Sequence, residues 1–143
     1  MQSAIAATTQ QVVPAQILRE LQLLFPALSA AYIFGSAARD ELNRDSDLDI
    51  AIDAGQPMTA LDRYDSAQKL AIAFSRDVDL IDFRVASDVL RHQILTTGER
   101  LFARDPAAQS SYEAAVLSDY LDFTAQRAPL MRDIAARGSV YVR

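Results

Sequence analysis

The sequence predicts an α/β fold, in which helices pack on a small mixed β-sheet. Three short apolar segments, residues 31–34, 47–53 and 78–83, have the length and composition of buried strands. Only a short helix and a loop join the first two, so we expect them to run antiparallel. Residues 59–75 carry apolar side chains at helical spacing, so a helix lies between the second and third strands. This order of strand, helix and strand favours a right-handed parallel crossover. Helices packed on a mixed sheet should result.

Proline, serine and glycine mark the ends of the other helices. Pro14 suits the first position of a helix, which Pro26 closes. Ser87 caps a further helix, and Gly98 ends it. In the helix over residues 59–75, one apolar stripe is expected to contain Leu61, Tyr64, Ala67, Leu70 and Phe74.

A longer helix is predicted from Asp105-Pro106 onward, and Pro129 is expected to interrupt it because a proline inside a helix removes a hydrogen bond. Its apolar stripe is wider than one solvent-facing helix normally shows. The residues of this stripe are Tyr112, Val116, Tyr120 and Phe123, with Leu117, Leu121 and Met131 beside them. We therefore expect a flexible N-terminus (1–13), a core (14–104) and a C-terminal helical extension (105–143) that binds a partner.

Composition limits the classes of function. The 143 residues are 50% hydrophobic, contain no cysteine and carry a net charge of −5. Without cysteine there is no disulfide or thiolate metal site, so we expect any metal to be held by oxygen ligands. An acidic chain without clusters of lysine and arginine is not expected to bind nucleic acid directly. No segment reaches the ~18 apolar residues of a membrane span. We expect a cytoplasmic protein.

The chemistry-bearing stretch is Phe34 to Asp53. Gly35-Ser36 ends the first apolar segment, and Asp47 and Asp49 begin the second. Side chains alternate along a strand, so these two carboxylates share one face. Two carboxylates so placed repel each other unless a cation lies between them, and Mg²⁺ is the cation that suits hard oxygen ligands and substrate phosphates.

Gly35-Ser36 is predicted to bind phosphate. Glycine lets the chain turn sharply and lets a ligand approach the backbone, and Ser36 can cap the short helix that follows. The free N–H groups of such a first turn bind anions. Arg39 can contact a phosphate oxygen or pair with the neighbouring Asp40 or Glu41.

A third carboxylate is offered by the strand at 78–83, where Asp79 and Asp82 point to opposite faces by alternation. The predicted crossover returns the start of this strand beside the start of the second, so Asp79 is expected to face Asp47 and Asp49. With its Gly-Ser, ten-residue spacer and Asp-x-Asp, the chain resembles the minimal nucleotidyltransferase (MNT) domains of the DNA polymerase β-like superfamily. Val78-Asp79-Leu80 is similar to the family's later carboxylate strand and favours Asp79. Family members usually carry glycine where this chain has Asp40.

The resemblance implies a polymerase β-like nucleotidyltransferase fold and transfer of AMP from ATP. In the family's scheme two Mg²⁺ ions are held by Asp47, Asp49 and Asp79, Asp79 helps to deprotonate the acceptor, and Gly35, Ser36 and Arg39 bind phosphates. A chain this short resembles the antitoxin of HEPN–MNT toxin–antitoxin pairs, which forms a complex with the toxin ribonuclease and adenylylates it on a tyrosine. Two alternatives stay open: a small-molecule, antibiotic-type adenylyltransferase, and a non-catalytic antitoxin that neutralises its partner by binding.

Overall fold

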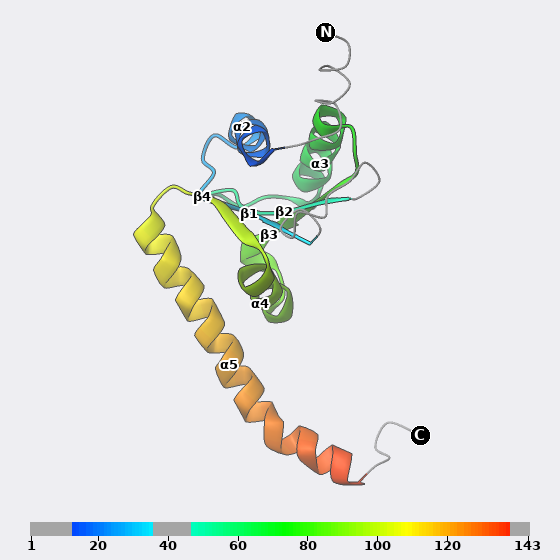
Figure 1. Cartoon of the computed structure of the whole chain (residues 1–143), viewed down its shortest axis with the longest axis vertical. Helices are drawn as coiled ribbons and strands as arrows, with labels where there is room; N and C mark the ends of the chain where they lie inside the picture. Colours follow the sequence, from blue (N-terminus) through cyan, green and yellow to red (C-terminus); the bar gives the residue numbers. More distant parts are fainter. Residues whose placement is uncertain (1–12, 36–46, 138–143) are drawn as a thin grey trace.

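The computed structural model describes residues 13–35 and 47–137, and Figure 1 shows them as a helix-covered sheet with one long helix leading away from it. The mixed α/β architecture is the one predicted. In chain order the elements are α2 (Pro14–Leu24), β1 (Ala30–Phe34), β2 (Leu48–Asp53), α3 (Ala60–Phe74), β3 (Val78–Asp82), the short 3₁₀ helix η1 (Phe83–Val85), α4 (Asp88–Thr97), β4 (Glu99–Ala103) and α5 (Pro106–Arg137).

The four strands form one sheet in the order β3-β2-β1-β4. β1 and β2 pair antiparallel, and β2 and β3 pair parallel, so both predicted strand directions are confirmed. β4 pairs antiparallel with the other side of β1. β1 therefore ends at the same edge of the sheet at which β2 and β3 begin.

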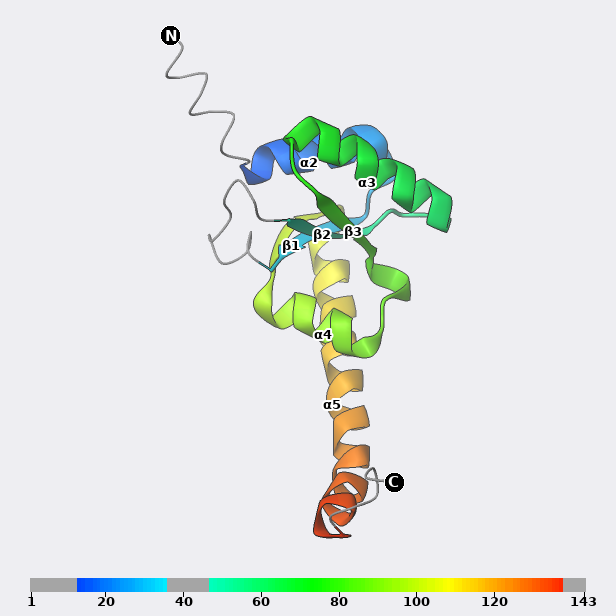
Figure 2. The ribbon, with the colours of Figure 1, turned by 90° about the vertical axis from the view of Figure 1, so that its right-hand side faces the viewer.

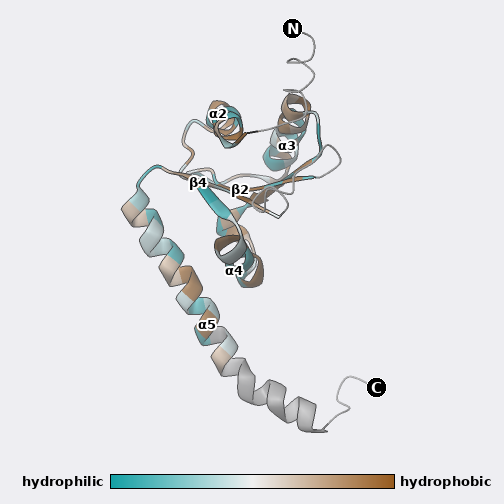
Figure 3. Cartoon of the chain, viewed as in Figure 1, coloured by the Kyte–Doolittle hydropathy of each residue, from teal (hydrophilic) through white to brown (hydrophobic). Residues whose placement is uncertain are grey.

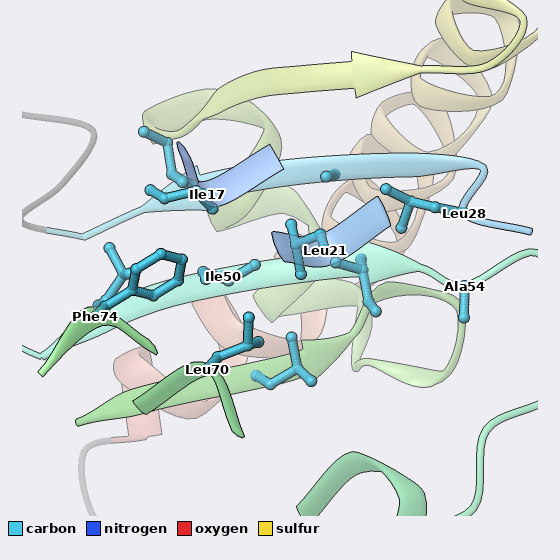
Figure 4. Close-up of a cluster of buried hydrophobic side chains, with 12 residues drawn as sticks. Ile17, Leu21, Leu28, Ile50, Ala54, Leu70 and Phe74 are labelled. Atoms are coloured by element: carbon cyan, nitrogen blue, oxygen red, sulfur yellow. The ribbon is translucent and has the colours of Figure 1, made fainter. Parts of the chain in front are cut away.

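Helices cover both faces of this sheet (Figure 2). α2 and α3 lie on one face, where Leu21 and Leu70 pack against Ile50 in the larger of the two cores (Figure 4). On the opposite face Ile94 of α4 packs with Phe83 and Tyr32. Alternation along β2 decides which residues belong to which core, because its isoleucines face α2 and α3 while its odd-numbered positions face α4.

α3 begins and ends as the capping residues predict. The Thr59 hydroxyl accepts from the Asp62 N–H at 3.0 Å, and Ser75 closes the helix in the left-handed conformation with φ of 56°. The predicted composition of its buried stripe is partly wrong. Leu61 and Tyr64 are 67% and 62% exposed, because the helix turns its face around Leu70, not theirs, toward the sheet.

β4 is an element that the sequence analysis did not predict as a strand. It begins with Glu99 and Arg100, and Figure 3 colours this first part of the strand as hydrophilic. An edge strand pairs on one side only and needs no continuous apolar pattern. Its place depends on Gly98, where an added Cβ would lie 2.6 Å from the Ile33 carbonyl oxygen and 3.0 Å from the Phe34 Cβ. Glycine thus allows the end of α4 to approach β1 closely.

The prediction that Pro129 interrupts the last helix is wrong, because α5 continues through this residue to Arg137. Proline's fixed φ is compatible with a helix, and the cost is one lost backbone hydrogen bond with local distortion. Among the helices within the described residues, none is both long enough and apolar enough to cross a membrane.

A buried polar network fastens α5 to the sheet. The Tyr32 hydroxyl donates to Glu113 Oε2 at 2.6 Å and accepts from Gln109 Nε2 at 2.7 Å. Arg100 Nη1 lies 3.1 Å from the same Glu113 oxygen. Tyr32 is 1% exposed and Gln109 is 6% exposed. Water cannot reach these polar groups, so the hydrogen bonds of the network satisfy them.

We predict an alkaline stability limit set by Tyr32. Burial, followed by the hydrogen bond to Glu113, raises the pKa of the Tyr32 hydroxyl well above its usual range. Above about pH 10 the unfolded chain therefore binds fewer protons than the folded chain, and the free energy of unfolding falls as pH rises. Tyr32→Phe should flatten this fall while costing ~1–3 kcal/mol at neutral pH, because Gln109 loses its acceptor.

Urea unfolding of both proteins across pH 7 to about 11 measures this effect. Tyr64→Phe is the matched control, since Tyr64 is exposed. The assignment would be wrong if the free energy of unfolding of the Tyr32→Phe variant fell at high pH as steeply as that of the parent protein.

Candidate active site

The predicted site residues meet at one edge of the sheet, where β1 ends and β2 and β3 begin. In the parallel register Asp49 of β2 is aligned with Asp79 of β3, and across the antiparallel pair Asp49 is opposite Phe34. Aligned residues of adjacent strands point to the same face, about 4.8 Å apart along the sheet. The fold thus brings together two carboxylates that are thirty residues apart in the sequence.

Gly35 places the backbone of the first turn against one of these carboxylates. It adopts φ of +66°, and a Cβ added there would lie 2.2 Å from Asp49 Oδ2. Only glycine adopts this conformation readily, and only glycine leaves the room that the carboxylate occupies. The predicted requirement for glycine at this turn therefore has a structural basis.

Asp47 lies at the entrance to the strand, exposed, one residue before β2 begins. The Leu48 N–H donates to the Asp77 carbonyl oxygen at 2.9 Å, which ties the start of β2 to the start of β3. Asp79 is also exposed. Two of the three predicted carboxylates thus face solvent at this edge, where a soluble substrate can reach them.

The donor chemistry of this edge fits a hard divalent cation. Carboxylate oxygens on two adjacent strands are the ligands that Mg²⁺ takes, and Mg²⁺ commonly needs only one or two of them in addition to substrate phosphates and water. In the part of the chain that the structure describes, no group of three or more acidic, histidine or cysteine side chains is arranged to hold a metal by itself. Asp49 and Asp79 would therefore form a partial ligand set that the substrate completes.

The remaining predicted phosphate ligands, Ser36 and Arg39, lie outside the described residues, as does Asp40.

Asp82 and Asp53 are excluded from this edge by their positions. Asp82 ends β3, where its Oδ1 accepts from the Arg84 N–H at 3.2 Å. Asp53 ends β2 with its side chain 6% exposed and accepts from Arg84 Nε at 2.7 Å. The hydrogen bond to Asp53 raises the pKa of Arg84. This pair holds η1 against the opposite end of the sheet and is structural.

Two cavities of ≈ 490 Å³ also lie at that opposite end, around Ser29, Gly55 and either Arg104 or Arg84. Asp53 and Asp82 line the second cavity, but both carboxylates already accept hydrogen bonds from Arg84. The chemistry of the residues, and not cavity size, therefore locates the candidate site at the edge around Gly35 and Asp49.

Sequence reasoning missed how α4 contributes to this edge. Gly98 sets the end of α4 against Ile33 and Phe34, the residues that precede the Gly35 turn. The only signal in the sequence is the glycine itself after a capped helix, and the reason for it is a tertiary contact. The position of the Gly35 turn thus depends partly on α4.

The comparisons with known proteins agree with this geometry. The model of the family described as polymerase beta, nucleotidyltransferase matches residues 15–107, which include the whole sheet. The chain belongs to this nucleotidyltransferase family. A curated relative, the protein adenylyltransferase MntA of Shewanella oneidensis, is 35% identical over 127 residues, which are 89% of this chain and 91% of the relative.

Solved structures of relatives extend the similarity to three dimensions. A toxin–antitoxin complex with AMP-PNP matches with a TM-score of 0.77 and 33% identity, covering 87% of this chain and 99% of that one. The MNT antitoxin in complex with a tri-AMPylated HEPN toxin of Shewanella oneidensis matches at 0.71 and 32%, covering 85% and 95%. A minimal nucleotidyltransferase matches at 0.50 and 30%, covering 59% and 87%.

Proposed function

We propose that this nucleotidyltransferase transfers AMP from ATP to a hydroxyl group of a cognate HEPN toxin and thereby acts as its antitoxin. The observation that carries this proposal is the register that aligns Asp49 with Asp79, with Gly35 against the Asp49 carboxylate. Relatives that share most of this chain support the acceptor, since one is a protein adenylyltransferase and another is bound to an AMPylated toxin.

The three carboxylates share one role in the proposed reaction, and Asp79 has a second. Asp47, Asp49 and Asp79 would hold Mg²⁺, which supplies positive charge to the triphosphate and to the departing pyrophosphate. Asp79, which is exposed on the outer strand, would accept the proton of the attacking hydroxyl. As the hydroxyl oxygen bonds to the α-phosphorus, the bond from that phosphorus to the bridging oxygen breaks, and pyrophosphate leaves.

The glycine turn orients the triphosphate for this displacement. Gly35 exposes its backbone where no Cβ intervenes, and Ser36 and Arg39 follow as the proposed partners of the β and γ phosphates. The acceptor hydroxyl must approach from solvent, in line with the leaving pyrophosphate. A protein side chain can do so because Asp47 and Asp79 are exposed.

The test is intact-mass spectrometry of a HEPN partner from the same organism, purified and incubated with this chain, ATP and Mg²⁺. We expect increments of one or more AMP groups on the partner, and none when EDTA replaces Mg²⁺ or when ATP is omitted. Parallel reactions with GTP, CTP and UTP determine the base preference.

Two outcomes would contradict the proposal. AMP transfer to an aminoglycoside but not to the HEPN partner would favour a small-molecule adenylyltransferase. Rescue of cell growth with an unmodified toxin would favour neutralisation by binding alone.

A further inference from the structure

Among the side chains that the structure describes, those of α5 that pack on the body of the protein lie in its first half, up to Tyr120. Its contacts there include the Tyr32, Gln109 and Glu113 network, and Val116 is 6% exposed. Farther along, the ring of Tyr120 stacks on His92 of α4, with the ring centroids 4.0 Å apart. These contacts fix the direction of the helix relative to the sheet.

Beyond Tyr120 the same helix runs on to Arg137, and Figures 1 and 2 both show it leaving the sheet and passing α4. Leu121, the next residue, is 63% exposed. A helical segment without tertiary support is only marginally stable in water, because most helical stability in proteins comes from packing one apolar face. A projecting helix of this length therefore needs a surface to pack on.

The sequence of the projecting part provides such a face. Val116 and Tyr120 lie on the side of α5 that packs on the body of the protein. Along the same side, apolar residues recur at helical spacing in the projecting part of the helix. These residues are Phe123, Leu130, Met131 and Ile134. An amphipathic helix with apolar residues at such intervals is suited to an apolar groove of another protein.

The extent of similarity to known proteins identifies which partner this is. The nucleotidyltransferase family model ends at residue 107, just after α5 begins, and the minimal nucleotidyltransferase matches only 59% of the chain. The antitoxin crystallised with its toxin and AMP-PNP matches 87%. A match over 87% of the chain must extend beyond the catalytic family model into α5.

A competing surface exists on α3, on the opposite layer. Leu61, Tyr64 and Ile72 are 67%, 62% and 80% exposed and lie along one side of that helix. They belong to the part of the chain that the catalytic family model already covers. They therefore carry no signal specific to antitoxins.

We propose that the projecting part of α5, residues 121–137, is the docking surface for the HEPN toxin. This rests on the proposed function for the identity of the partner. The anchored first part then sets the distance and direction between the bound toxin and the carboxylates of β2 and β3. Docking on α5 would provide affinity for the toxin without using residues of the catalytic core.

The test uses full-length variants. Phe123→Asp combined with Leu130→Asp should weaken toxin binding at least tenfold in calorimetry, because charge is placed on the proposed docking face. Stabilisation by Mg²⁺ and ATP, read as a shift in melting temperature, should stay unchanged. Leu61→Asp combined with Ile72→Asp is the matched control on α3, and we expect toxin affinity equal to that of the parent.

Each alternative occupant has its own result. Loss of toxin binding in the α3 pair but not in the α5 pair would overturn the inference. So would a parent protein that forms a dimer in light scattering and becomes monomeric in the α5 variant, because the occupant would then be a second copy. Toxin that binds through α5 yet stays unmodified would instead contradict the proposed transfer and leave the docking surface standing.

Discussion

Asp49→Asn is expected to lower the rate of AMP transfer at least about a hundredfold, equivalent to ~2.7 kcal/mol of transition-state stabilisation. Asparagine keeps the shape of the side chain but removes the negative charge that the proposed Mg²⁺ requires. The fold should survive, and the melting temperature should stay the same or rise, because Asp49 and Asp79 no longer repel each other. The measurements are the initial rate of partner modification and thermal unfolding.

Asp82→Asn is the matched control, since Asp82 lies on β3 but at the opposite end, and asparagine can still accept from the Arg84 N–H. Transfer should be unaffected. If Asp82→Asn were inactive and Asp49→Asn active, the carboxylate site would have to be moved to the other end of the sheet.

Asp79→Asn separates binding from chemistry. Asp47 and Asp49 remain, so Mg²⁺ with ATP should still raise the melting temperature by mass action. Transfer should nevertheless be lost, because the acceptor hydroxyl has no group to take its proton. Loss of the thermal shift together with the activity would indicate that Asp79 serves nucleotide binding and not the acceptor.

Gly35→Ala is expected to reduce affinity for a non-hydrolysable ATP analogue at least tenfold. The added Cβ would meet Asp49 Oδ2 at 2.2 Å, and φ of +66° disfavours any residue with a Cβ by ~1–2 kcal/mol. Relief of this strain must either move the turn or displace the carboxylate, and both changes damage the proposed site. Isothermal titration calorimetry in the presence of Mg²⁺ measures the affinity.

Gly55→Ala provides the comparison. Gly55 also has positive φ, +83°, and its added Cβ would lie 1.9 Å from the Ala27 carbonyl oxygen, but at the far end of the sheet. This variant should unfold at a lower temperature while its folded form binds nucleotide normally. Equal nucleotide affinity in the Gly35→Ala variant and the parent would show that the turn does not bind phosphate.

Local patterns in the sequence were sufficient for β1, β2 and β3, their directions and the glycine turn. Apolar alternation along β2 is a property of successive residues, so it assigns Asp47 and Asp49 to one face without knowledge of the rest of the chain. A short connection implies an antiparallel neighbour, and a helix between two strands implies a parallel one. Each of these inferences needs only residues close together in the chain.

Only the tertiary structure decided which distant groups meet. The predicted crossover already brought Asp79 near Asp47 and Asp49, and the register between β2 and β3 decided that Asp49 is the aligned residue. Packing turned Leu61 outward although its spacing fitted the stripe. β4 was missed because an edge strand needs no apolar pattern, and Pro129 did not end α5, because proline's φ fits a helix. Register, helix rotation and edge pairing depend on contacts between residues far apart in the chain, about which local periodicity carries no information.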